Sequence, residues 1–257
     1  MELNKIYVEN CIETLQKMPD DFLDMTLASP PYDDLRVYNG YTLPLEKTIE
    51  LLFAKTKPGG VVVWVVADRT VNGAETMTSF RHAMGFGRAG FTLHDTMIYA
   101  KNNPIPSDCG RRYIQQFEYM FCFAKGTPKA FNPIVRPSKS QSAFRSFRIT
   151  KSGRSDLGFD RTAPDARKAG NIFFYNVGTS SATDRIAFRH PAIFPERLAE
   201  DQIATWTNEG DLVYDCFMGS GTTARSASIL GRNWIGSEIS VEYAAIAEER
   251  LKFLSRS

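Results

Sequence analysis

The C-terminal part of the chain alternates strand-like and helix-like segments, and this alternation constrains the fold more than any other feature. Residues 211–217 and 234–238 are short apolar segments typical of buried strands, whereas residues 222–230 and 241–254 have the apolar spacing of helices. A strand–helix–strand–helix order places the two strands in one parallel sheet, with the helices packed on it. The sequence therefore predicts a parallel α/β fold.

Upstream segments extend the predicted sheet. Five further strands are predicted, at residues 5–10, 24–28, 61–67, 90–101 and 117–124. Helices are predicted at residues 11–18, 43–56, 76–89 and 195–206. The longest apolar segment, residues 59–67, is too short to span a bilayer, so no membrane association is expected. The N-terminus has no signal-peptide pattern, which gives the cytoplasm as the expected location.

Charge is unevenly distributed along the 257 residues, whose net charge is only +2. Residues 101–190 contain 16 Lys and Arg but 6 Asp and Glu. Within this region, residues 126–187 are rich in Ser, Gly and Pro and lack helical or strand periodicity, which predicts an insertion that contacts a polyanion such as nucleic acid. A solvated basic surface is the alternative. The expected phosphate or base-edge contacts are Arg111, Arg112, Arg136, Lys139, Arg145, Arg148, Lys151 and Arg154.

A glycine-rich turn follows the predicted strand 211–217. Asp215 lies near the end of this strand, Gly219 and Gly221 permit a tight turn, and Glu238 closes the next strand. Glycines let a backbone approach a ligand, and an acid at the second strand suits ribose hydroxyls. Asp215 would repel a pyrophosphate but suits an amino-bearing cation. S-adenosylmethionine, with a sulfonium, an amino group and no phosphate, fits this pattern; a purely structural turn is the alternative.

The tetrapeptide Ser29-Pro30-Pro31-Tyr32 follows the predicted strand 24–28. Two prolines make this segment rigid at the strand end where α/β sheets bind ligands. The exocyclic amine of a nucleobase is a weak nucleophile, because its lone pair is delocalised into the ring. The Ser29 hydroxyl and the Pro30 carbonyl can accept its two hydrogens and free that lone pair, while Tyr32 stacks on the base. A structural Pro-Pro loop is the alternative.

Together, the Ser-Pro-Pro-Tyr segment and the segment Asp-Cys-Phe-Met-Gly-Ser-Gly-Thr-Thr at 215–223 resemble the DNA amino-methyltransferases, which methylate cytosine N4 or adenine N6. The tetrapeptide comes first and the glycine turn last, as in the permuted β group of that family. The resemblance implies a circularly permuted, Rossmann-like class I methyltransferase fold with a mostly parallel, seven-stranded sheet. It also implies a catalytic domain of residues 1–125 and 188–257 and a target recognition insertion of residues 126–187.

The resemblance extends to the segments 59–67, 117–126, 190–198 and 236–239 and implies S-adenosylmethionine as cofactor, with no metal. The residues implied to bind this cofactor are Asn10, Cys11, His190, Phe194, Pro195, Asp215, Phe217, Gly219, Gly221, Thr222, Thr223 and Glu238. Two positions depart from the family pattern. Asn10 stands where Asp is frequent, and Cys216 replaces a proline. We expect Cys216 to be a buried thiol, because amine methylation needs no covalent intermediate.

Ser29 favours cytosine over adenine as the target, because the family's Ser-Pro-Pro-Tyr members are mostly cytosine enzymes. A hydroxyl can also donate to cytosine N3, which a carboxylate cannot. We therefore expect an enzyme that flips a cytosine out of a specific duplex DNA sequence and methylates its N4 amine. Adenine-N6 methylation on the same fold is the alternative, and a DNA-binding module without activity is an alternative of another class. A cognate restriction endonuclease and a second copy of the chain are further expected partners.

Overall fold

The computed structural model describes residues 1–31, 43–104, 110–137, 166–178, 181–191, 193 and 195–254, and the backbone alone of residues 143–150 and 153–162. The chain divides into two compact units. Unit 1 comprises Met1–Asn132 and Asn171–Ser257, and unit 2 comprises Pro133–Gly170. Unit 2 lies inside the expected insertion 126–187, whose two ends belong to unit 1. The role of the insertion in target recognition stays a prediction.

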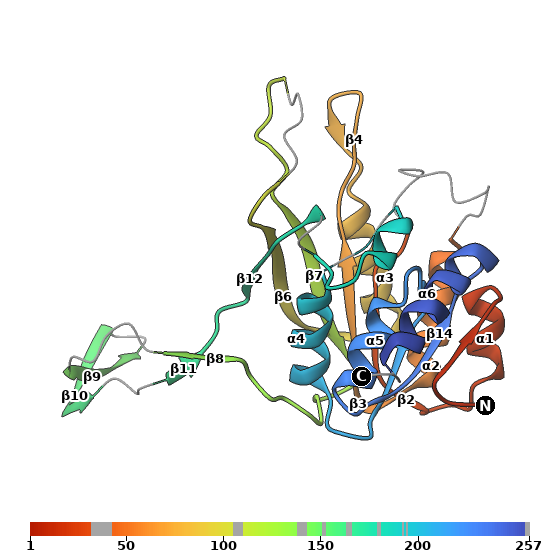
Figure 1. Ribbon diagram of the computed structural model, residues 1–257. Helices are drawn as coiled ribbons and strands as arrows, with labels where there is room; N and C mark the ends of the chain where they lie inside the picture. The colour runs from red at the N-terminus through yellow and green to blue at the C-terminus, as the bar shows by residue number, and fades with distance from the viewer. Residues whose placement is uncertain are drawn as a thin grey trace. The chain divides into compact units, whose positions relative to one another are not determined.

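Unit 1 is built on a central sheet, whose described strands lie in the order β1-β14-β13-β2-β3-β7-β6-β12 (Figure 1). The strands are β1 (Lys5–Tyr7), β2 (Leu23–Ala28), β3 (Thr56–Val66), β6 (Thr92–Lys101), β7 (Phe117–Ala124), β12 (Ile172–Tyr175), β13 (Leu212–Asp215) and β14 (Asn233–Ser237). All neighbours are parallel except β7, which is antiparallel to β3 and β6. The mostly parallel α/β sheet is confirmed. It has eight described strands instead of the expected seven, because β12 pairs with the outer edge of β6.

Helices cover both faces of this sheet (Figure 1). One face carries α1 (Cys11–Lys17), α2 (Leu45–Lys55) and α3 (Thr78–Ala89), and the other carries α4 (Glu196–Trp206), α5 (Thr222–Ile229) and α6 (Val241–Leu254). The central strand β3 explains this cover, because Val63 and Val65 face one core while Trp64 and Val66 face the other. Residues 61–66 of β3 are all apolar and all buried, as expected of a strand segment that is covered on both sides. No helix in the described ranges has the length and apolar character to span a bilayer.

The sheet changes its winding direction between β13 and β2. The chain leads from β13 to β14 on one side and from β2 to β3 on the other, and such a topological switch point is where α/β sheets bind ligands. The two strands are parallel neighbours, with Val213 opposite Met25 and Tyr214 opposite Thr26. The residues that follow β2 and those that follow β13 therefore lie at the same sheet edge.

Smaller elements complete the two units. In unit 1, β4 (Thr70–Val71) and β5 (Ala74–Glu75) form a hairpin after β3, and a short 3₁₀ helix, η2 (Ile186–Arg189), precedes α4. In unit 2, β9 (Ala143–Thr150) pairs antiparallel with β10 (Gly153–Thr162), and β8 (Val135–Pro137) pairs antiparallel with β11 (Ala166–Lys168). The sequence did not predict the strands of unit 2, since this region lacks alternating apolar residues.

Candidate active site

The residues expected to bind ligands follow four adjacent strands at one sheet edge. Asn10 follows β1, Glu238 follows β14, Asp215 ends β13 and Ser29 follows β2. These four strands are mutually parallel, so their C-terminal ends share one edge. The rigid Ser-Pro-Pro segment and the glycine-rich turn, which are separated by about 190 residues in the chain, therefore begin at neighbouring strand ends.

Two carboxylates fix the shape of the glycine-rich turn. The carboxylate of Asp215 accepts hydrogen bonds from the Phe217 amide at 2.9 Å and from the Thr223 hydroxyl at 2.6 Å. The carboxylate of Glu238 accepts from the Gly219 amide at 2.7 Å and from the Ser240 amide at 2.9 Å. Two buried acids, one at the end of β13 and one directly after β14, thus hold the turn.

The glycines of the turn are required by backbone angle and by space. Gly219 and Gly221 have φ angles of 51° and 80°, a region that side chains disfavour. A β-carbon at Gly221 would lie 2.9 Å from the β-carbon of Ala247 on α6. A β-carbon at Gly219 would lie 3.1 Å from the His190 ring. The turn therefore packs tightly against α6 and against the segment before α4.

The electrostatics of the turn favour a ligand that donates hydrogen bonds. Burial raises the pKa of Asp215 to about 7, and the charge of Glu238 adds to this rise, although the bonds from Thr223 and Phe217 oppose it. Burial likewise raises the pKa of Glu238. Two neighbouring buried carboxylates are poorly stabilised as anions and gain from a cationic or hydroxyl-bearing ligand. The amino group and ribose hydroxyls of S-adenosylmethionine fit this donor requirement, whereas a pyrophosphate does not.

The Ser-Pro-Pro segment is anchored by a fully buried strand. Every residue of β2 is buried, as is Pro30, while Ser29 and Pro31 are half-buried. A short segment at the end of such a strand has little freedom, and proline restricts it further. Tyr32, the expected stacking residue, lies outside the described residues.

The structure also describes other residues that are expected to bind the cofactor. His190 is buried beside Gly219, and its ring packs edge-to-face on Tyr243 with 4.3 Å between ring centroids. Pro195 occupies the N-cap position of α4, and Thr222 begins α5. The ring of Phe217 contacts Trp64 edge-to-face at 5.9 Å. Phe194 lies outside the described residues.

Asn10 and Cys11 stand at the start of α1. The Asn10 side chain caps this helix by accepting from the Ile12 amide at 2.9 Å. Cys11 is buried in the core beneath α1 and α2, and burial raises the pKa of its thiol to about 11. Their expected part in cofactor binding stays a prediction.

Cys216 is buried, and burial raises the pKa of its thiol well above the ordinary value. A thiol that stays protonated is a weak nucleophile, in keeping with the expectation of a packing role. His82 is also buried and accepts a hydrogen bond from the Trp64 indole at 3.0 Å. Over the described part of the chain, no three His, Cys, Asp or Glu residues are grouped so as to hold a metal ion.

The basic residues expected to contact phosphates occur in both units. In unit 1, Arg111 is exposed, and Arg112 donates to the Gly73 carbonyl and pairs with Glu75 of the β4–β5 hairpin. In unit 2, Arg136 is exposed on β8. For Arg145, Arg148 and Arg154 the structure gives the backbone alone, and Lys139 and Lys151 lie outside the described residues.

Sequence reasoning missed Arg167 as a candidate. The pairing of β8 with β11 places Arg167 directly opposite Arg136, and both residues are exposed. Like charges directly opposite on paired strands destabilise a sheet, and a bound anion relieves the repulsion. No local sequence signal marks this pair, because its two members meet only through strand pairing.

Comparisons with known proteins identify the family of the chain. The N6/N4 methyltransferase family model, described as DNA methylase, matches residues 23–249. Orphan methyltransferase M.BamHII of Bacillus amyloliquefaciens is 47% identical over 243 residues, which is 92% of this chain and 91% of that protein.

Solved structures share the fold. The cytosine-N4-specific PvuII DNA methyltransferase matches with a TM-score of 0.71 at 23% identity, over 96% of this chain and 85% of that one. The M1.HpyAVI–SAM complex matches with a TM-score of 0.67 at 24% identity, over 96% and 98%.

Proposed function

The chain belongs to the DNA methylase family of N6 and N4 methyltransferases, and we propose that it methylates the N4 amine of a cytosine in a specific duplex DNA sequence, with S-adenosylmethionine as methyl donor. The main support is the parallel pairing of β13 with β2, from whose ends the glycine-rich turn and the Ser29-Pro30 segment start. One ligand cavity at this edge would bring a cofactor and a target base together.

Each of the two segments has its own task in this proposal. S-adenosylmethionine supplies a methyl group on a positively charged sulfur, which an amine nitrogen can attack directly. Asp215 would hold the amino group of the cofactor, and Glu238 would hold its ribose hydroxyls. The Ser29 hydroxyl and the Pro30 carbonyl accept the two amine hydrogens of the base, which localises the nitrogen lone pair for attack. As the amine nitrogen bonds to the methyl carbon, the carbon–sulfur bond would break and leave a neutral thioether, and the proton that the amine loses would pass to solvent.

Duplex DNA is the partner that this chemistry requires. The target base must leave the stack, because its amine is otherwise out of reach of the cofactor. Unit 2 holds nine Lys and Arg against three Asp over residues 133–170, and its opposed pair of Arg136 and Arg167 favours a phosphate between them. A cognate restriction endonuclease and a second copy of the chain are not needed for the reaction and stay predictions.

Transfer of a tritiated methyl group tests the proposal. The protein is incubated with labelled S-adenosylmethionine and unmethylated duplex DNA, and the digested nucleosides are separated. We expect label in N4-methylcytosine alone. Label only in N6-methyladenine would overturn the cytosine assignment, and no label in DNA would overturn the proposal as a whole.

Two variants assign the reaction to the Ser-Pro-Pro-Tyr segment. Ser29→Ala removes one of the two acceptors and is expected to lower kcat by roughly 10- to 100-fold, with the KM for S-adenosylmethionine unchanged. Tyr32→Ala is expected to reduce methylation through lost stacking. A Tyr32→Ala variant that methylates DNA at the wild-type rate would contradict the assigned base pocket.

A further inference from the structure

Arg250, on α6, is fully buried and contacts the glycine-rich turn. Its Nη1 atom donates to the carbonyl oxygen of Ser220 at 2.7 Å and lies 3.2 Å from the hydroxyls of Ser220 and Thr222. Ser220 stands between Gly219 and Gly221. Because a peptide unit is planar, fixing the Ser220 carbonyl also fixes the direction of the Gly221 N–H.

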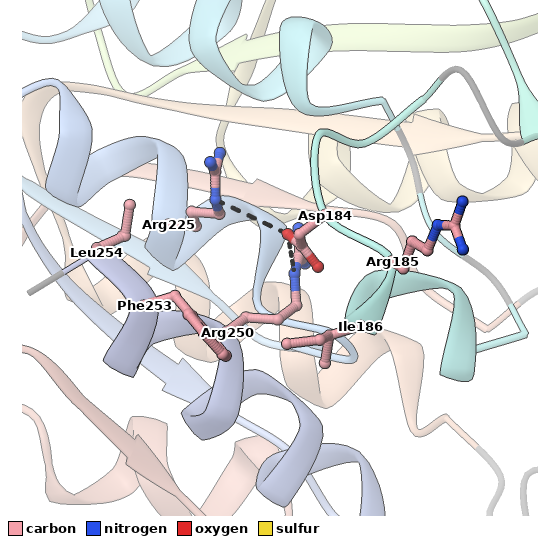
Figure 2. Close-up of a pocket in the computed structure, with 7 residues that line it drawn as sticks. All are labelled: Asp184, Arg185, Ile186, Arg225, Arg250, Phe253 and Leu254. Carbon is pink, nitrogen blue, oxygen red and sulfur yellow. Dashed lines mark hydrogen bonds and ion pairs between the residues drawn. The ribbon is translucent and has the colours of Figure 1, made fainter. Parts of the chain in front are cut away.

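The same guanidinium holds the segment 183–196, which precedes and begins α4. Its Nη2 donates to Glu196 at 2.7 Å and its Nε to Asp184 at 3.0 Å. Glu196 in turn accepts from the Thr183 amide and hydroxyl, both at 2.9 Å. Arg225 of α5 joins the network, lying 3.4 Å from Glu196 and 4.0 Å from Asp184. Figure 2 shows the two arginines converging on Asp184 from α5 and α6.

The network is neutral and tightly constrained. Two arginines face two carboxylates, and all three nitrogens of Arg250 donate hydrogen bonds. Burial raises the pKa of Asp184, but the Ala187 amide and the charge of Arg250 outweigh it and hold this pKa below the ordinary value. A buried ion pair is stable only while its geometry is kept. Arg250 therefore ties the turn to Asp184, which precedes α4, and to Glu196, which begins it.

We propose that Arg250 is a positioning residue for the cofactor, coupling the glycine-rich turn to the segment 183–196, which includes His190. His190 closes the arrangement on the other side, since its ring packs against Gly219. The coupling is expected to hold the glycine-rich turn and this segment in the same arrangement before and after the cofactor binds. Because it concerns cofactor binding, it rests on the proposed function.

Arg250→Lys tests the coupling. A lysine keeps the charge, but its compact ammonium cannot span Ser220, Glu196 and Asp184 together. We expect the KM for S-adenosylmethionine to rise about tenfold, with kcat and the KM for DNA changed less than about twofold. The matched control is Glu248→Gln, which changes an exposed side chain two residues before Arg250 on the same helix. This control is expected to behave as the wild type.

Hydrogen–deuterium exchange without cofactor separates this inference from the proposed function. In Arg250→Lys, amides of residues 216–224 and 183–196 should exchange faster than in the wild type, whereas in Glu248→Gln they should not. Failure of the proposed function would appear as a wild type that binds no S-adenosylmethionine, and the exchange comparison would still test the coupling.

Three outcomes would overturn the role of Arg250. One is a KM for the cofactor in Arg250→Lys that equals that of the wild type. Another is hydrogen exchange in Arg250→Lys that is unchanged in both segments. The third is a loss of kcat, cofactor affinity and DNA affinity in parallel, which indicates general destabilisation. If Arg250→Lys does not fold, Asp184→Asn weakens one partner of Arg250 and is expected to raise the same KM about threefold, with kcat unchanged.

Discussion

The Glu238 carboxylate accepts a hydrogen bond from the Gly219 amide at 2.7 Å, so the residue after β14 closes the turn that follows β13. Its other oxygen accepts from Ser240 at 2.9 Å. An oxygen of a carboxylate can accept more than one hydrogen bond, which leaves Glu238 able to bind a hydroxyl while it holds the turn. The geometry of the turn and the proposed ribose binding would thus depend on one side chain.

Glu238→Ala is expected to weaken both of these roles. The change leaves two amides without their acceptor and should lower the free energy of unfolding by about 1–3 kcal/mol. Affinity for S-adenosylmethionine, measured by calorimetry, should fall by at least about tenfold. Glu242→Ala, at an exposed position in the first turn of α6, is the matched control and should change neither quantity. Unchanged cofactor affinity in Glu238→Ala would mean that the ribose is bound elsewhere.

Asp215→Asn is expected to stabilise the cofactor-free protein while it weakens cofactor binding. The folded-state pKa of Asp215, about 7, exceeds that of the unfolded chain, so its ionisation opposes folding. The protonated carboxyl of Asp215 therefore stabilises the folded state at low pH. This stabilisation is lost as the pH rises from about 4 to about 7. At pH 8 the variant should be more stable than the wild type by up to about 4 kcal/mol.

Thermal unfolding at several pH values checks this prediction. The difference in Tm between Asp215→Asn and the wild type should grow between about pH 4 and pH 7 and then level off. Glu242→Gln serves as the control for a change at an exposed carboxylate. A Tm difference that is constant over this range would contradict the raised pKa of Asp215.

Gly221→Ala is expected to cost more stability than an equally strained glycine elsewhere. Gly73, in the β4–β5 hairpin, has a φ of 78° that is close to the 80° of Gly221, but a β-carbon added at Gly73 would have nothing within 4 Å. Gly73→Ala should therefore cost only the backbone strain of about 1–2 kcal/mol. At Gly221 the contact with Ala247 should add about 1–3 kcal/mol. Equal costs in urea unfolding would show that α6 does not confine the turn.

Arg136→Ala and Arg167→Ala are expected to reduce the salt dependence of DNA binding. If each arginine neutralises one phosphate, each change should lower the slope of log K against log salt by about 0.9, and the double variant by about twice that. Arg88→Ala, at an exposed arginine on α3, is the control. Fluorescence anisotropy over a range of salt concentrations gives the slopes. An unchanged slope in the double variant would remove this pair from the DNA interface.

The sequence predicted those parts of the fold whose signals are local. The helix 241–254 and the strand 117–124 were predicted with the bounds that the structure has, because apolar spacing and flanking residues mark their ends. The expected family membership is confirmed as well. The turn from Asp215 to Gly221 was also visible, since strand end, glycines and helix start are contiguous.

Features that depend on distant pairing were not predictable. β12 is only four residues long, and its place in the sheet comes from pairing with β6, as in the match of Ile172 with Ile98. The contact of Arg250 with Ser220 joins residues 30 positions apart and has no sequence pattern of its own. Opposition of Arg136 and Arg167 likewise exists only once β8 and β11 pair.

The two points where the chain leaves and re-enters unit 1 are each pinned to it. The Asn132 amide donates to the Thr205 carbonyl at 2.8 Å, and the Asn171 carbonyl accepts from the Ile98 amide at 2.8 Å. The chain is thus held to unit 1 on both sides of unit 2 by hydrogen bonds that involve no residue of 133–170. The stretch between them can therefore change in length and composition without breaking either hydrogen bond.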